Sequence, residues 1–143
     1  MKEIDAIRAL MATDMATVDQ HIEAKLASDV ALVNQISQYI IHSGGKRLRP
    51  MLTLTCARAC GFRANVHVSA AAIIEFIHTA TLLHDDVVDH SDMRRGKGTA
   101  NAVFGNAASV LVGDYLYSRS FQMMVEIGEM RIMEIMADAT NTI

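Results

Sequence analysis

The segment His84-Asp85-Asp86-Val87-Val88-Asp89 places acidic side chains at the spacing of one helical turn. Because a helix turns by about 100° per residue, Asp85 and Asp89 project from the same face. Like charges at this spacing destabilise a helix, so a cation is expected to compensate them. Mg²⁺ suits such a pair, because it binds one or two carboxylates and completes its shell with waters and phosphate oxygens. With the Arg94-Arg95 pair close behind, the region predicts a site for a magnesium–diphosphate ligand.

Further polar side chains lie on the same face of this helix. Within an arc of roughly 80° fall Glu75, His78, Leu82, Asp85 and Asp89, with Thr81 beside them. Burial of such a row without partners would be costly, which indicates a binding site; a polar face in contact with water is the alternative. Asp86 and Asp92 either extend the site or are solvated, and Glu75 either orients His78 or is buried and paired. His84 and His90 are expected to be structural or exposed.

A second candidate site is the basic turn Ser43-Gly44-Gly45-Lys46-Arg47-Leu48-Arg49-Pro50. Glycine lets the backbone approach a ligand closely, and a helix that starts near Pro50 would present free N–H groups to an anion. Lys46 and Arg49 would add positive charge. The spacing is not that of a Walker loop. Taken alone, such a turn is most often a solvated loop.

Hydrophobic spacing predicts an all-α fold that positions these residues. The expected helices cover residues 4–26, with a break near 13–14 as an alternative, 28–41 with Ser28 or Asp29 as N-cap and Gly44-Gly45 as stop, 50–61, 66–89, 107–127 and 131–143. Residues 95–98 are expected to form a loop, and no strand is predicted.

Composition agrees with one globular helical domain. Apolar residues make up 51% of the 143 residues, and the net charge of −3 gives no general attraction to nucleic acid. Cys56 and Cys60 are predicted to be buried thiols on one helix face. Neither a signal peptide nor an uninterrupted transmembrane run is recognised, so a cytoplasmic location is expected. The last helix has no evident cap, which suggests that the chain is part of something longer.

Taken together, these blocks resemble the trans-polyprenyl diphosphate synthases, the all-α isoprenoid chain-elongating enzymes. The resemblance covers nearly the whole chain and rests on the segments 44–50, His78, 83–89, 92–96 and Gly113-Asp114-Tyr115-Leu116. It implies the N-terminal half of an isoprenoid-synthase-type helical bundle. It also implies an enzyme that condenses an allylic prenyl diphosphate with isopentenyl diphosphate, uses Mg²⁺ and acts as a homodimer. The pattern is nearest to bacterial members that make octaprenyl chains for quinones.

Carried over residue by residue, the resemblance implies specific roles. Asp85 and Asp89 would bind the Mg²⁺ that bridges the allylic diphosphate, and Arg94 would contact the same group. Isopentenyl diphosphate would be held by Lys46, Arg49, His78 and Arg95. Ala80 and Thr81 are small, which resembles the open chain-length pocket of long-chain synthases. Its floor is expected among Phe121, Met123 and Met124, for which ordinary core packing is an equal alternative.

One departure from the family pattern is the absence of a second Asp-Asp-x-x-Asp motif from these 143 residues. The chain is therefore expected to be inactive by itself. A non-catalytic helical subunit or partner of such a synthase remains an alternative. Another is a di-iron carboxylate bundle, because Glu75-x-x-His78 matches one half of its ligand set.

Overall fold

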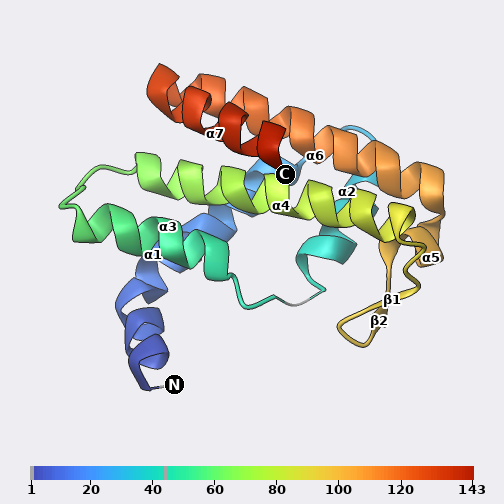
Figure 1. Ribbon diagram of the computed structural model, residues 1–143, viewed down its shortest axis with the longest axis horizontal. Helices are drawn as coiled ribbons and strands as arrows, with labels where there is room; N and C mark the ends of the chain where they lie inside the picture. The colour runs from blue at the N-terminus through green and yellow to red at the C-terminus, as the bar shows by residue number, and fades with distance from the viewer. Residues whose placement is uncertain (1, 44) are drawn as a thin grey trace.

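The computed structural model describes residues 2–43 and 45–143, and the described chain is almost entirely helical. Its helices are α1 (Lys2–Leu26), α2 (Ala31–Ile41), α3 (Leu48–Ala59), α4 (Val66–Val88), α5 (Ala100–Phe104), α6 (Asn106–Ile127) and α7 (Met130–Thr142). Two short strands, β1 (Met93–Arg94) and β2 (Lys97–Gly98), pair antiparallel between α4 and α5. The predicted all-α fold is confirmed (Figure 1).

Helix α4 is the central element of the fold. It packs mainly against α6, and also against α3 and α1. Figure 1 shows α4 running between α6 and α3, with α1 crossing behind. Its Ala71, Phe76 and Leu83 side chains are fully buried, and each large apolar side chain buried in this way contributes about 1.5–3 kcal/mol. Although α4 is long and apolar enough to cross a membrane, 61% of that apolar window is buried inside the fold, as in a core helix.

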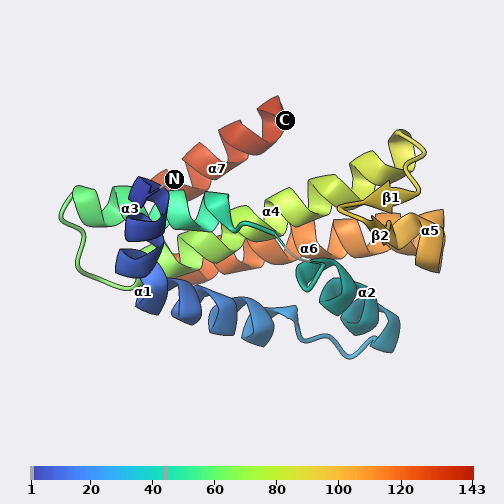
Figure 2. The ribbon, with the colours of Figure 1, turned by 90° about the horizontal axis from the view of Figure 1, so that it is seen from below.

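Most helix boundaries agree with the sequence-based expectation. Helix α1 is continuous instead of broken, and Thr17 Oγ1 donates a hydrogen bond to the Thr13 carbonyl, a contact that bends helices. Figure 2 shows its N-terminal part pointing away from the rest of the helix. Neither Ser28 nor Asp29 is the N-cap of α2, because that position is Val30. The predicted stop at Gly44 lies outside the described residues.

Two elements were not predicted, the hairpin β1–β2 and the short helix α5. Both depend on hydrogen bonds between loop residues. The Thr99 side chain caps α5 by accepting from the Ala102 amide and also donates to the Ser91 carbonyl. Such local polar contacts leave no hydrophobic periodicity in the sequence.

The prediction of buried cysteines is wrong, because both thiols are exposed. Helix α3 buries Met51 and Leu54 toward the core. At about 100° per residue, Cys56 and Cys60 fall on the opposite side of the helix. The two cysteines share one face of the helix, as predicted, but this face is exposed to solvent.

Candidate functional site

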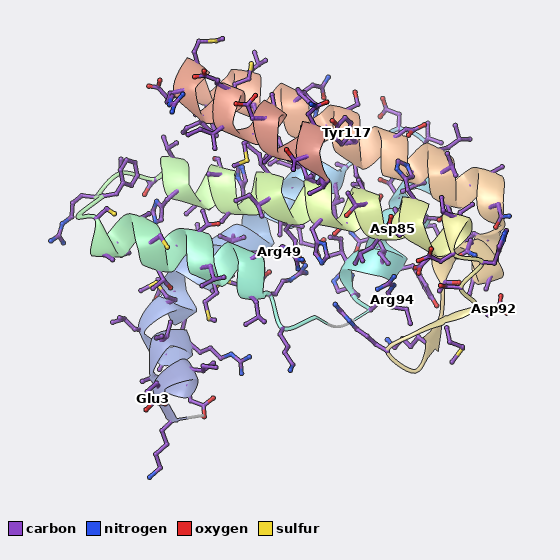
Figure 3. The ribbon with its side chains drawn as sticks, viewed as in Figure 1. Glu3, Arg49, Asp85, Asp92, Arg94 and Tyr117 are labelled. Carbon is purple, nitrogen blue, oxygen red and sulfur yellow. The ribbon has the colours of Figure 1, made fainter. Side chains whose placement is uncertain are left out.

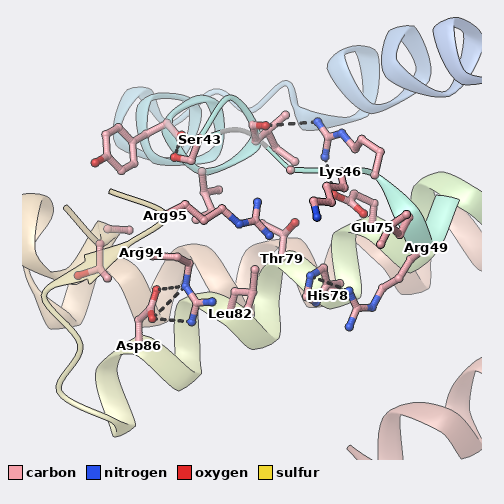
Figure 4. Close-up of a pocket in the computed structure, with 18 of the residues that line it drawn as sticks. Ser43, Lys46, Arg49, Glu75, His78, Thr79, Leu82, Asp86, Arg94 and Arg95 are labelled. Atoms are coloured by element: carbon pink, nitrogen blue, oxygen red, sulfur yellow. Dashed lines mark hydrogen bonds and ion pairs between the residues drawn. The ribbon is translucent and has the colours of Figure 1, made fainter. Parts of the chain in front are cut away.

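A cavity of about 490 Å³ opens between three segments that are far apart in the sequence. One wall is the α2–α3 connection, another is the middle of α4, and the third is the hairpin β1–β2 with the residues that follow it. Figure 4 shows side chains from all three segments converging on the cavity. The buried side chains of α4 fix the position of the α4 wall. Ion pairs attach the α2–α3 connection and the hairpin to this wall.

Basic side chains outnumber acidic ones among the residues that line the cavity. The residues that carry positive charge or can acquire it are Lys46, Arg47, Arg49, His78, Arg94 and Arg95. Only two carboxylates, Glu75 and Asp86, lie among the lining residues, and each is engaged by an arginine. A surplus of positive charge therefore remains at the cavity wall, which favours a multiply charged anion.

Glu75 is buried and paired, which is one of the two roles predicted for it. Arg47 Nη1 donates to Glu75 Oε1 at 2.5 Å, while Arg47 Nη2 donates to the Ile41 carbonyl at 3.3 Å. Arg47 adopts a left-handed backbone conformation (φ 47°) as the N-cap residue of α3. Its role was missed in the sequence, although a buried carboxylate demands a cationic partner. Because Arg47 occupies Glu75, the Glu75–His78 pair does not provide the ligands of a di-iron site.

His78 lies one turn further along α4 and faces Arg49. The two side chains approach at 3.1 Å between His78 Nε2 and Arg49 Nη1. Burial lowers the pKa of His78, and repulsion from Arg49 lowers it further. The imidazole is therefore held neutral beside several cations, and an arriving anion would reverse that balance.

Asp86 anchors the hairpin to α4. It is 1% exposed and accepts from Arg94 Nε and from Arg94 Nη2, the latter at 2.7 Å. This hydrogen bonding raises the pKa of Arg94. The sequence left the role of Asp86 open, but it follows Glu75 by eleven residues, about three turns, and so shares the buried face.

The neighbouring Arg95 lies against the α2–α3 connection. A Cβ atom added to Gly45 would lie 2.8 Å from Arg95 Nη1. The absence of a side chain at this position therefore makes room for the guanidinium group. Tyr39, also missed in the sequence, donates its hydroxyl hydrogen to the Gly98 carbonyl at 2.7 Å and so holds the end of the hairpin.

Asp85 lies on α4 and Asp89 is the C-cap residue of that helix, but neither lines the cavity. Both are exposed, and the Asp89 amide donates to the Asp85 carbonyl, so they are one helical turn apart. Figure 3 shows Asp85 on α4 and Arg94 on the hairpin near the same end of the helix, and both aspartates lie close enough to favour the charged form of Arg94. Asp92 is exposed.

This aspartate pair fits a divalent ion that keeps waters and accepts phosphate oxygens. Within residues 2–43 and 45–143, no group of three or more His, Cys, Asp or Glu side chains is arranged as a metal cage. A two-carboxylate site for Mg²⁺ does not require one.

The residues predicted to form a chain-length pocket are not part of this cavity. Ala80 is buried in the core, Thr81 is half-buried, and its hydroxyl donates to the His78 carbonyl. Met123 and Met124 are 1% exposed and belong to the core cluster, while Phe121 packs edge-on against Tyr117.

Comparison with known proteins relates this arrangement to a family of enzymes. A family model described as polyprenyl synthetase matches residues 30–143. The chain is 59% identical to octaprenyl diphosphate synthase from Escherichia coli over 98% of its own length and 43% of the relative. It is 46% identical to a geranyl-diphosphate-specific all-trans-nonaprenyl-diphosphate synthase from Rhodobacter capsulatus, of which it spans 42%.

Solved structures agree with this similarity. A decaprenyl diphosphate synthase from Rhodobacter capsulatus superposes with a TM-score of 0.93 at 52% identity, over 96% of this chain and 42% of that one. A polyprenyl synthase from Caulobacter crescentus, in complex with calcium and isoprenyl diphosphate, gives 0.94 at 47% identity over the same shares. The chain thus spans less than half the length of these relatives.

Proposed function

This chain belongs to the polyprenyl synthetase family, and we propose that it forms the diphosphate-binding half of a trans-prenyltransferase. The complete protein would condense an allylic prenyl diphosphate with successive isopentenyl diphosphates. The observation that carries the proposal is the cavity whose walls concentrate five Lys and Arg side chains and His78, while both carboxylates among them are neutralised by arginines.

Isopentenyl diphosphate would occupy the cavity itself. Lys46, Arg49, His78 and Arg95 reach it from three different segments. The planar guanidinium groups of Arg49 and Arg95 suit bidentate contact with phosphate oxygens, and Lys46 adds a compact charge. These contacts would orient the double bond of the substrate toward the end of α4 that carries the aspartates.

The allylic diphosphate would bind beside Asp85, Asp89 and Arg94. When bound there, Mg²⁺ would supply stabilisation of the negative charge that develops on the leaving diphosphate. Arg94 would add to it, because its side chain is 33% exposed even while it holds Asp86. The chain offers electrostatic stabilisation and positioning here, so no protein nucleophile is required. The isopentenyl double bond would attack the allylic carbon, and loss of a proton would complete each extension.

Binding measurements on the protein test this proposal. Calorimetric titration with isopentenyl diphosphate should give saturable binding that weakens with salt, whereas uncharged isopentenol should not bind. Arg49→Ala should weaken binding by about tenfold, equivalent to about 1.4 kcal/mol. Arg131→Ala is the matched control, since Arg131 is exposed on α7 and pairs only locally with Glu134. Equal affinities for the two variants would contradict the proposal.

The same resemblance supports a long-chain, octaprenyl-type product for quinone side chains and a cytoplasmic homodimer. Ala80 and Thr81, which lie five and four residues before Asp85 respectively, would leave room for a growing chain, with Met123 near its floor. In the complete protein, Thr81→Phe should shorten the longest product, as measured by chromatography of the dephosphorylated alcohols. Unchanged products would exclude this role for Thr81.

A further inference from the structure

The helical glycine Gly113 lies directly against the residue that precedes the aspartate pair. A Cβ atom added to Gly113 would lie 2.3 Å from His84 Nε2 and 2.6 Å from His84 Cδ2. Both distances are far below van der Waals contact, so any other residue would expel the imidazole. Glycine is the poorest helix former after proline. Its presence inside the 22-residue helix α6 is accounted for by this close packing.

The neighbour of Gly113 holds the same ring by a polar contact. His84 Nε2 lies 3.2 Å from Asp114 Oδ1 and 3.2 Å from the Val110 carbonyl oxygen. Since both partners are acceptors, Nε2 carries a proton and donates to them. The Nε2 edge of the imidazole is thus held against α6 both by the space at Gly113 and by hydrogen bonds.

A third contact fastens the adjacent residue of α4 to α6. Ser109 Oγ donates to the Leu83 carbonyl at 3.0 Å, and Leu83 itself is fully buried. Residues 83 and 84 are therefore pinned to α6 immediately before Asp85. Because side-chain directions on a helix are set by its rotation and position, this attachment also sets the direction of the carboxylates that follow.

We propose that Gly113 and Asp114 are positioning residues for the aspartate pair. They hold His84 in a notch of α6, and so keep Asp85 and Asp89 aimed at the bound diphosphate. The inference rests on the proposed function. It assigns a role to the Gly113-Asp114 block, which contacts neither the cavity nor the substrates in that proposal. Displacement of a catalytic group by about 1 Å can cost about a hundredfold in rate, so a single methyl group at Gly113 is a severe test.

The test uses the complete protein and separates metal-dependent from metal-independent binding. Gly113→Ala should raise the Mg²⁺ concentration for half-maximal turnover by about tenfold and lower kcat, while the KM for isopentenyl diphosphate stays within about twofold. Asp114→Asn should also raise the Mg²⁺ concentration for half-maximal turnover and lower kcat, each by a smaller factor. Asp138→Asn, an exposed site on α7, is the control and should change neither.

Rescue distinguishes a positioning role from a general loss of structure. The double variant Gly113→Ala with His84→Ala removes the overlap but also the held ring, so its Mg²⁺ affinity should recover to the smaller defect of Asp114→Asn. An unchanged Mg²⁺ dependence in Gly113→Ala would overturn the inference and leave the proposed function intact. If Gly113→Ala lost Tm, isopentenyl diphosphate affinity and Mg²⁺ affinity together, without rescue, the inference would also be overturned and the proposed function left intact. A wild-type protein with no Mg²⁺-dependent turnover would overturn both.

Discussion

At the scale of single residues, the charge balance of the cavity depends on which carboxylates are already paired. Glu75 and Asp86 are buried and bound to arginines, so they neutralise part of the basic cluster. Asp85 and Asp89 are exposed and carry their charge into solvent. Burial, more than residue type, separates the structural carboxylates from those available to a metal ion.

His78 gives a prediction about pH. Burial lowers its pKa, so it is neutral in the free protein near pH 7; a bound diphosphate would favour the imidazolium and raise that pKa again. Binding of isopentenyl diphosphate should therefore take up a proton, and affinity should rise as the pH falls from about 8 to about 6, around the ordinary histidine pKa. Calorimetry in buffers of different ionisation enthalpy measures this uptake.

His78→Gln provides the control for protonation of the ligand itself. It should abolish the part of the proton uptake that belongs to the imidazole, and equal uptake in both proteins would contradict the assignment. In the free protein the lowered pKa also has a consequence for stability. The unfolded chain binds the proton more readily, so the free energy of unfolding should fall as the pH drops below about 6.5.

At the scale of elements, the end of α4 is electrostatically unfavourable without a ligand. Asp85, Asp86 and Asp89 lie in its last turns or at its C-cap, where the helix dipole is negative and each charge repels the next. Only Asp86 is compensated by a direct ion pair, with Arg94. On the proposed function, a bound cation would relieve this repulsion, which otherwise lowers the stability of the free fold.

Opposite effects are expected for two substitutions in this turn. Asp89→Asn should raise the urea midpoint of the metal-free protein, because it removes a repulsive charge, but should abolish stabilisation by Mg²⁺ with diphosphate. Asp86→Asn should lower the free energy of unfolding by about 1.5–3 kcal/mol, the usual contribution of hydrogen bonds to charged groups. Urea unfolding followed by circular dichroism measures both, and equal shifts for the two variants would contradict this division.

The hairpin β1–β2 gives a second prediction at this scale. Tyr39→Phe keeps the ring contact with Phe104 but removes the hydroxyl that binds the Gly98 carbonyl. Loss of this bond, about 1 kcal/mol, should loosen Arg94 and Arg95 and weaken isopentenyl diphosphate binding about fivefold by titration. Tyr117→Phe, on the exposed side of α6, is the control. Unchanged binding in Tyr39→Phe, or an equal loss in the control, would contradict the role of the hydroxyl group as an anchor.

At the scale of the whole molecule, the helices bring together segments that are distant in the sequence. Arg47 meets Glu75 across 28 residues, and Tyr39 meets Gly98 across 59. The packing of α4 against α3 brings the first pair together, and the packing of α2 against α5 and α6 brings the second pair together. The fold therefore assembles a cavity with a surplus of basic side chains within a chain that carries one of the two aspartate-rich motifs expected for the family.

This leads to a prediction about turnover. The 143-residue chain with Mg²⁺, farnesyl diphosphate and isopentenyl diphosphate should bind substrate but form no longer prenyl product, because half of the expected metal-binding carboxylates are missing. Radiolabelled isopentenyl diphosphate and extraction of prenyl alcohols provide the assay. The complete protein, assayed in parallel, is the positive control. Elongated products from the chain alone would refute the prediction.

The sequence by itself determined the all-α fold, most helix boundaries, the shared face of Asp85 and Asp89, and the basic turn beside Pro50. These are local properties, because hydrophobic spacing and side-chain direction repeat with the helical period. Only the tertiary structure decided that Asp86 and Glu75 are paired, that Tyr39 anchors the hairpin, and that Gly113 accommodates His84. Each of these contacts joins residues from different segments, and their distance is set by how the helices pack, which no short window of sequence encodes.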